Sequence, residues 1–152
     1  MNVVPTSIGV QERTRNALER VKREINATSL DATLAALLAE HEELKARQAS
    51  ARLLRSIREK RVELARMAAR HGIRSLAVFG STLHGDARPD SDLDLLAVFE
   101  KGRTPGLIAM GSIERELSKL LAVPIDLQTP ASLSKHIRDQ VLAEALEIYG
   151  TS

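Results

Sequence analysis

The residues best suited to chemistry lie in one polar segment, GSTLHGDARPDSDLDLL, which opens on a glycine-serine pair and contains two closely spaced aspartates near its end. Asp92 and Asp94 stand two residues apart at the start of an apolar run. On an extended strand both carboxylates then project from the same face. Two like charges this close are costly unless a cation lies between them. Because Mg²⁺ prefers carboxylate and phosphate oxygens as ligands, the pair predicts a magnesium site.

Two further features point to the same chemistry. Gly80 and Ser81 follow the apolar run SLAVF, and a short helix at 82–84 would gather backbone N–H groups beside a hydroxyl, which suits an anionic phosphate. A third carboxylate, Asp126, interrupts the apolar run VPIDL. Burying an acid alone is expensive, so we expect Asp126 to face the same cleft as the first two aspartates. Such a trio can hold metal ions and accept the proton of an attacking hydroxyl in an in-line phosphoryl displacement.

Each feature alone has an ordinary structural explanation. A glycine-serine pair is usually only a turn, and an Asp-x-Asp pair is more often the solvated edge of a strand. The combination of a glycine-serine strand end, two aspartates in an apolar strand and a third on a later strand predicts function.

Residues from about 52 to 150 resemble the minimal nucleotidyltransferase (MNT) domain of the DNA polymerase β-like superfamily, whose hallmark is Gly-Ser, ten residues, then Asp-x-Asp. The resemblance implies a small mixed sheet flanked by helices, with Gly80 and Ser81 on a nucleoside triphosphate. It also implies Asp92 and Asp94 on Mg²⁺ and Asp126 as the third carboxylate, so that all three aspartates are both catalytic and metal-binding. Many members carry an arginine soon after Gly-Ser, whereas Thr82, Leu83 and His84 fill those places here. Arg88 is the candidate replacement for binding phosphate, and His84 is close enough to the turn to contact a nucleotide.

The same resemblance suggests a biological role. MNT proteins commonly serve as antitoxins to HEPN-type ribonuclease toxins, and some transfer AMP from ATP to a tyrosine of the toxin. We therefore expect a cytoplasmic, Mg²⁺-dependent nucleotidyltransferase that transfers AMP from ATP to a hydroxyl of such a toxin. Two alternatives remain open. The chain could be a non-catalytic antitoxin that binds DNA or sequesters its partner, or it could transfer a nucleotide to RNA.

The elements that must position these residues follow from hydrophobic periodicity. We expect strands at 75–79, 93–99 and 125–127, with helices at 51–70, 106–122 and 133–149. Gly72 follows the first of these helices as a stop signal. In the N-terminal part we expect a strand at 3–10, a helix from Glu12 to about residue 25, and a second helix capped by Ser29. Periodicity weakens at 48–50, which suggests a joint, although no proline or glycine enforces one and a single long helix is the alternative.

Residues 3 to about 46 resemble the ribbon-helix-helix family of DNA-binding antitoxins. One such chain cannot bury a strand and two helices by itself, so the resemblance implies a homodimer through residues 1–46 that could bind operator DNA. The outward-facing positions of the ribbon would be Pro5, Ser7 and Gly9, which lack the bidentate hydrogen bonding that reads bases. The expected organisation is a dimerisation or DNA-binding module at 1–46, a joint at 47–51 and an MNT domain at 52–152.

Composition excludes several other classes. The chain has 152 residues and no cysteine, so it has no disulfides, thiolate metal site or catalytic thiol. No apolar run approaches the roughly 18 residues of a membrane span, so we expect no membrane association. The net charge of +2 combines 14 basic and 9 acidic side chains in residues 1–70 with 8 and 11 in residues 71–152. A basic run at 45–70 is either a solvated face or a surface for an acidic partner.

Overall fold

The computed structural model describes residues 9–87 and 91–150. The chain divides into two compact units, Met1–Glu42 and Glu43–Ser152. The second unit contains a four-stranded mixed sheet made of β1 (Ile73–Val78), β2 (Leu93–Phe99), β3 (Ile125–Gln128) and β4 (Leu146–Gly150). The strand order is β3-β2-β1-β4, in which β1 runs antiparallel to β2 and β4 whereas β2 and β3 are parallel. This is the small mixed sheet with flanking helices that the sequence predicts.

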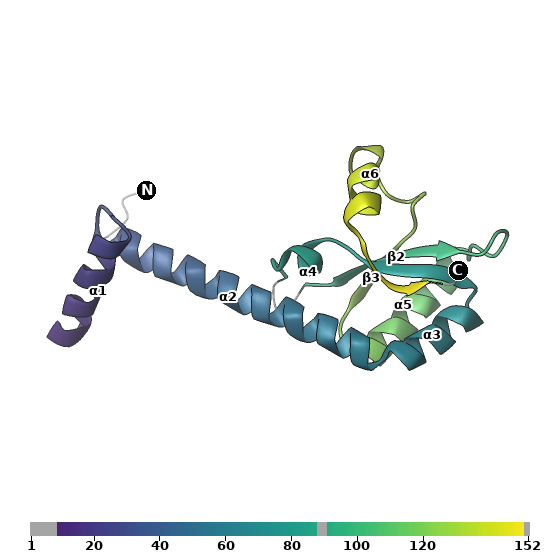
Figure 1. Cartoon of the computed structure of the whole chain (residues 1–152), viewed down its shortest axis with the longest axis horizontal. Helices are drawn as coiled ribbons and strands as arrows, with labels where there is room; N and C mark the ends of the chain where they lie inside the picture. The colour runs from purple at the N-terminus through teal and green to yellow at the C-terminus, as the bar shows by residue number, and fades with distance from the viewer. Residues whose placement is uncertain (1–8, 88–90, 151–152) are drawn as a thin grey trace. The chain divides into compact units, whose positions relative to one another are not determined.

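Helices cover both faces of this sheet. On one side lie α3 (Arg61–Arg70) and α5 (Leu107–Leu121), and on the other lies α6 (Lys135–Glu144) (Figure 1). The larger core packs α3, α5 and the end of α2 against alternate residues of β2, among them Leu93 and Leu95. A smaller cluster joins Leu96 to Phe79, Leu133 and the α6 side of the sheet. Alternation along β2 therefore turns Asp94 to the α6 side, together with Leu96.

The secondary structure of the N-terminal unit, as far as it is described, is helical. Helix α1 spans Glu12–Glu24. Helix α2 spans Leu30–Glu59, so its second half belongs to the second unit. The predicted cap is confirmed, because the Ser29 hydroxyl accepts a hydrogen bond of 3.0 Å from the backbone N–H of Ala32. The strand expected at 3–10 falls mostly outside the described residues, and the two that are described, Gly9 and Val10, are not in a strand.

Two boundaries differ from expectation. Helix α2 continues without a break through 48–50, and the chain turns at Lys60, whose ammonium group donates a hydrogen bond of 2.5 Å to the Leu120 carbonyl. The predicted closing helix at 133–149 is wrong in its second half. Helix α6 ends at Glu144, and β4 follows because its residues pair with the free edge of β1. In the described part of the chain, no helix is both long and apolar enough to cross a membrane.

Candidate active site

The backbone at Gly80, just after β1, lies directly against the carboxylate of Asp94. Antiparallel pairing of β1 with β2 is extended by the Phe79 N–H, which donates a 3.1 Å hydrogen bond to the Asp94 carbonyl. The next residue, Gly80, has a φ of +71°, which side chains rarely adopt, and a Cβ there would overlap Asp94 Oδ2. Glycine is therefore required at this position, because the backbone turns directly against the aspartate.

Ser81 begins the short helix α4 (Ser81–His84), as the sequence predicts. The Leu83 N–H donates to the Gly80 carbonyl at 3.1 Å, and the Asp86 N–H donates to the Ser81 carbonyl at 2.9 Å. The first amides of a helical turn have no acceptor within the helix, which leaves them available to a ligand. The half-buried Ser81 side chain stands at this same end, next to Gly80.

The parallel pairing of β2 with β3 brings two of the three predicted carboxylates together. Asp94 on β2 is the register partner of Asp126 on β3, so the two lie side by side on neighbouring strands, about 4.8 Å apart along the hydrogen-bonding direction. Both side chains are half-buried. Asp92 immediately precedes β2 and is exposed. Strand register thus places Asp94 beside Asp126, whereas Asp92, expected on the same strand face as Asp94, lies just before the strand.

The electrostatics of Asp94 agree with this placement. Its partial burial, followed by the negative charges of Asp126 and then Asp92, raises the pKa of Asp94 above its ordinary value. Carboxylate oxygens gathered in this way fit Mg²⁺, since a divalent cation would remove the repulsion. Within residues 9–87 and 91–150, no three acidic or histidine side chains are already gathered as a complete metal site. Two of the candidate ligands are placed side by side by strand register, and the third, Asp92, is exposed just before β2.

Gln128 is a site residue that the sequence did not reveal. It lies two residues after Asp126 on the same strand face, and its side-chain amide donates a 2.8 Å hydrogen bond to Asp126 Oδ1. A polar residue on a short strand is ordinary, so only the i to i+2 spacing from an acid could have drawn attention to it.

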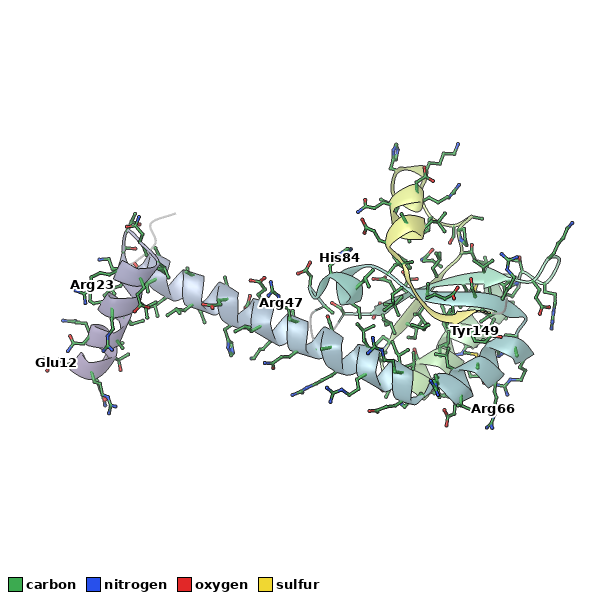
Figure 2. All side chains as sticks on the ribbon, viewed as in Figure 1. Glu12, Arg23, Arg47, Arg66, His84 and Tyr149 are labelled. Atoms are coloured by element: carbon green, nitrogen blue, oxygen red, sulfur yellow. The ribbon has the colours of Figure 1, made fainter. Side chains whose placement is uncertain are left out.

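Two other candidate residues have different outcomes. Arg88, expected to bind phosphate, lies outside the described residues. His84 stands on α4 (Figure 2), where its imidazole faces the Glu144 carboxylate of α6 at 3.3 Å. The two residues help to line a cavity of about 220 Å³. Gly80, Phe79 and Val141 are among its other lining residues. His84 therefore lies next to the Gly80–Ser81 turn, as its position in the sequence suggests.

Comparisons with known proteins agree with this geometry. A model of the nucleotidyltransferase domain matches residues 54–148. The protein adenylyltransferase MntA of Thermococcus cleftensis is 38% identical over 79 residues, which cover 52% of this chain and 78% of that protein. A candidate protein adenylyltransferase of Methanocaldococcus jannaschii is 28% identical over 79 residues, covering 52% of this chain and 83% of that protein.

Among solved structures, a toxin-antitoxin complex with AMP-PNP shares the fold, with a TM-score of 0.51 and 21% identity over 60% of this chain and 74% of that one. The domain model covers more than half of the chain, and it includes Gly80, Ser81 and all three aspartates. The chain therefore belongs to the nucleotidyltransferase domain family and is a nucleotidyltransferase of the minimal, MNT type.

Proposed function

We propose that this nucleotidyltransferase transfers AMP from ATP to a hydroxyl group of a HEPN-type toxin and thereby acts as its antitoxin. The observation that carries the proposal is the register pairing of Asp94 with Asp126 beside the Gly80–Ser81 turn. The relative from Thermococcus cleftensis, which is named a protein adenylyltransferase, supports AMP as the group transferred and a protein as the acceptor.

Each residue has a chemical role in this proposal. Gly80 and Ser81 bind the triphosphate through the backbone amides and the hydroxyl, and Arg88 adds positive charge. Asp92, Asp94 and Asp126 would hold Mg²⁺, which supplies charge neutralisation at the phosphates. Asp126 accepts the proton of the attacking hydroxyl, whose oxygen forms a bond to the α-phosphorus. The bond from that phosphorus to the bridging oxygen breaks, and pyrophosphate leaves.

A labelling experiment tests this proposal. The purified chain is incubated with Mg²⁺, ATP labelled at the α-phosphate, and the protein encoded by the neighbouring gene. We expect label on that protein with the wild-type chain and with Asp139→Asn, a matched control at an exposed acid of α6. We expect no label with Asp94→Asn. Absence of label with the wild-type chain would contradict the proposal, as would protection of cells by Asp94→Asn.

We also propose that residues 1–46 form a homodimer of the ribbon-helix-helix type. Among the described residues of the N-terminal unit, no apolar side chain is buried, and Ile25, Leu34 and Leu38 are exposed. A second copy would cover these side chains. Sedimentation of the intact chain tests this, and a monomer at micromolar concentration would contradict it.

Binding of nucleic acid, either operator DNA without catalysis or RNA as the acceptor of the nucleotide, is the second candidate function, and one observation favours it. Exposed arginines follow one another along the end of α2 and the start of α3, and no ion pair engages them in the described part of the chain: Arg52, Arg55, Arg58 and Arg61. Such a row would bind the phosphates of operator DNA or of an RNA acceptor. A gel shift with the chain's own promoter at 150 mM salt distinguishes specific operator binding from random DNA, and labelled RNA in the transfer assay tests RNA as the acceptor.

A further inference from the structure

The third carboxylate of the site is held by a hydrogen-bonded chain that leads away from the sheet. Asp126 Oδ1 accepts a 2.8 Å hydrogen bond from Gln128 Nε2, and Gln128 Oε1 accepts one of 2.8 Å from the Ser132 hydroxyl. A glutamine side chain has one donor end and one acceptor end. An ionised carboxylate can only accept, so the donor end of the glutamine faces the aspartate. The acceptor end lies 2.8 Å from the Ser132 hydroxyl, which is also 2.9 Å from the Thr129 carbonyl.

Ser132 is itself held by the turn that follows β3. Its hydroxyl accepts a 2.9 Å hydrogen bond from the Thr129 N–H, and the Ser132 N–H donates to the Thr129 hydroxyl at 3.2 Å. The start of α6 anchors the same loop, since an Arg138 amino group donates a 2.8 Å hydrogen bond to the Leu133 carbonyl. The Gln128 amide is thus bound between Asp126 and a residue of the turn, and Arg138 of α6 binds the backbone next to that residue.

We propose that Gln128 is the positioning residue of Asp126, an inference that rests on the proposed function. The amide occupies Oδ1 and restricts rotation of the carboxylate, which leaves Oδ2 for the acceptor hydroxyl. Asp94 has a different neighbour, because its carboxylate lies in the space that a side chain at Gly80 would occupy. Side chains that orient a reactive group in this way are worth about 10- to 100-fold in activity.

Steady-state kinetics separate a positioning role from a structural one. For Gln128→Leu and Ser132→Ala we expect kcat to fall by about 10- to 100-fold. The KM for ATP should stay within about twofold, because the triphosphate-binding turn at Gly80 and Ser81 is untouched. Ser132→Thr keeps the hydroxyl and should restore most of kcat. Gln48→Leu, the same substitution at an exposed position of α2, is the matched control and should match the wild type.

A spectroscopic measurement tests the hydrogen bond without depending on activity. In ¹H–¹⁵N spectra of the intact chain, the side-chain amide of Gln128 should exchange slowly with water and shift when Asp126 is replaced by Asn. The amide of Gln48 should exchange quickly and not respond. A Gln128 amide that behaves like that of Gln48 would overturn the inference, as would an unchanged kcat in Gln128→Leu. If the wild type transfers no nucleotide while the Gln128 amide is held, the proposed function fails and the positioning of Asp126 stands.

Discussion

The apolar residues of the two units meet different surroundings. In residues 43–152, leucines and isoleucines of three helices and the sheet bury one another, and Leu64, Leu93 and Leu95 have no exposed surface. In the described residues of the N-terminal unit, the apolar side chains of α1 and α2 are partly or largely exposed, with Leu38 at 63%. The unit of residues 43–152 therefore has an apolar core of its own, whereas the described part of the N-terminal unit buries no apolar side chain.

The candidate active site and the proposed dimer interface lie in different units. All the described candidate active-site residues lie on β1, β2 and β3 or directly beside them, within the unit that has a core. The N-terminal unit exposes apolar side chains on α2, among them Leu34 and Leu38, whereas the unit with the core exposes others, above all Leu107 and Ile108 at the start of α5. Substitutions in one unit should therefore leave the property of the other unchanged.

The largest effect should come from the core. Leu95→Ala removes a fully buried side chain of β2 and should lower the free energy of unfolding by about 2–5 kcal/mol, because the cavity cannot collapse in a packed sheet. Leu38→Ala, the same change on exposed α2, should cost below about 0.5 kcal/mol. Urea unfolding followed by circular dichroism measures both values. Equal losses at the two positions would contradict the contrast between the units.

Gly80→Ala should come next. The added Cβ meets Asp94 Oδ2, and the backbone conformation is one that alanine rarely adopts, so we expect a loss of about 1–3 kcal/mol in folding free energy. Displacement of the Asp94 carboxylate should lower nucleotidyl transfer by at least about 100-fold. Gly106→Ala is the matched control, because a Cβ there meets nothing within 4 Å. Normal transfer by Gly80→Ala would show that Asp94 need not lie where the structure places it.

Leu38→Glu addresses assembly alone. A charge on the exposed face of α2 should weaken self-association by about tenfold or more, since burying an unpaired carboxylate costs more than 1.4 kcal/mol. Sedimentation across a concentration series measures this change. Transfer per chain should remain within about twofold. A dimer of unchanged affinity would show that this face of α2 is not the interface.

Asp94→Asn should have the smallest effect on stability, and its sign depends on pH. Burial and the neighbouring aspartates raise the pKa of Asp94 in the folded state, so ionisation of this group opposes folding. The wild type should lose stability as pH rises from the ordinary aspartate pKa through the raised value. Without Mg²⁺, Asp94→Asn should be more stable above that window, by less than about 1 kcal/mol, and equal to the wild type below it.

Thermal unfolding at several pH values measures the difference. Asp139→Asn, at an exposed acid of α6, serves as the control and should show no such gain. A stability gain for Asp94→Asn that persists at low pH would mean that charge is not its cause.

Local patterns predicted most of the site and its supporting elements. The apolar run from Leu93 to Phe99 forms β2 with the expected bounds, and Asp94 and Asp126 lie side by side on the neighbouring strands β2 and β3. These features depend on periodicity within a few residues.

The features that the sequence did not predict depend on contacts between distant segments. Residues 146–150 form β4 because β1 offers a free edge, and helical spacing alone gives no sign of that pairing. The turn at Lys60 coincides with its hydrogen bond to Leu120, which is far away in the sequence. The role of Gln128 depends on its amide, which is bound between Asp126 and Ser132.

The place of β3 in the sheet bears on the size of the molecule that Asp126 can meet. In the order β3-β2-β1-β4, β3 is an outer strand, and among residues 9–87 and 91–150 only β2 pairs with it. A residue on an inner strand is approached from above or below the sheet, whereas one on an outer strand is also open from the side. In the proposed reaction, a hydroxyl on the surface of a folded protein would therefore have one more direction of approach to Asp126 than to Asp94 on the inner strand β2.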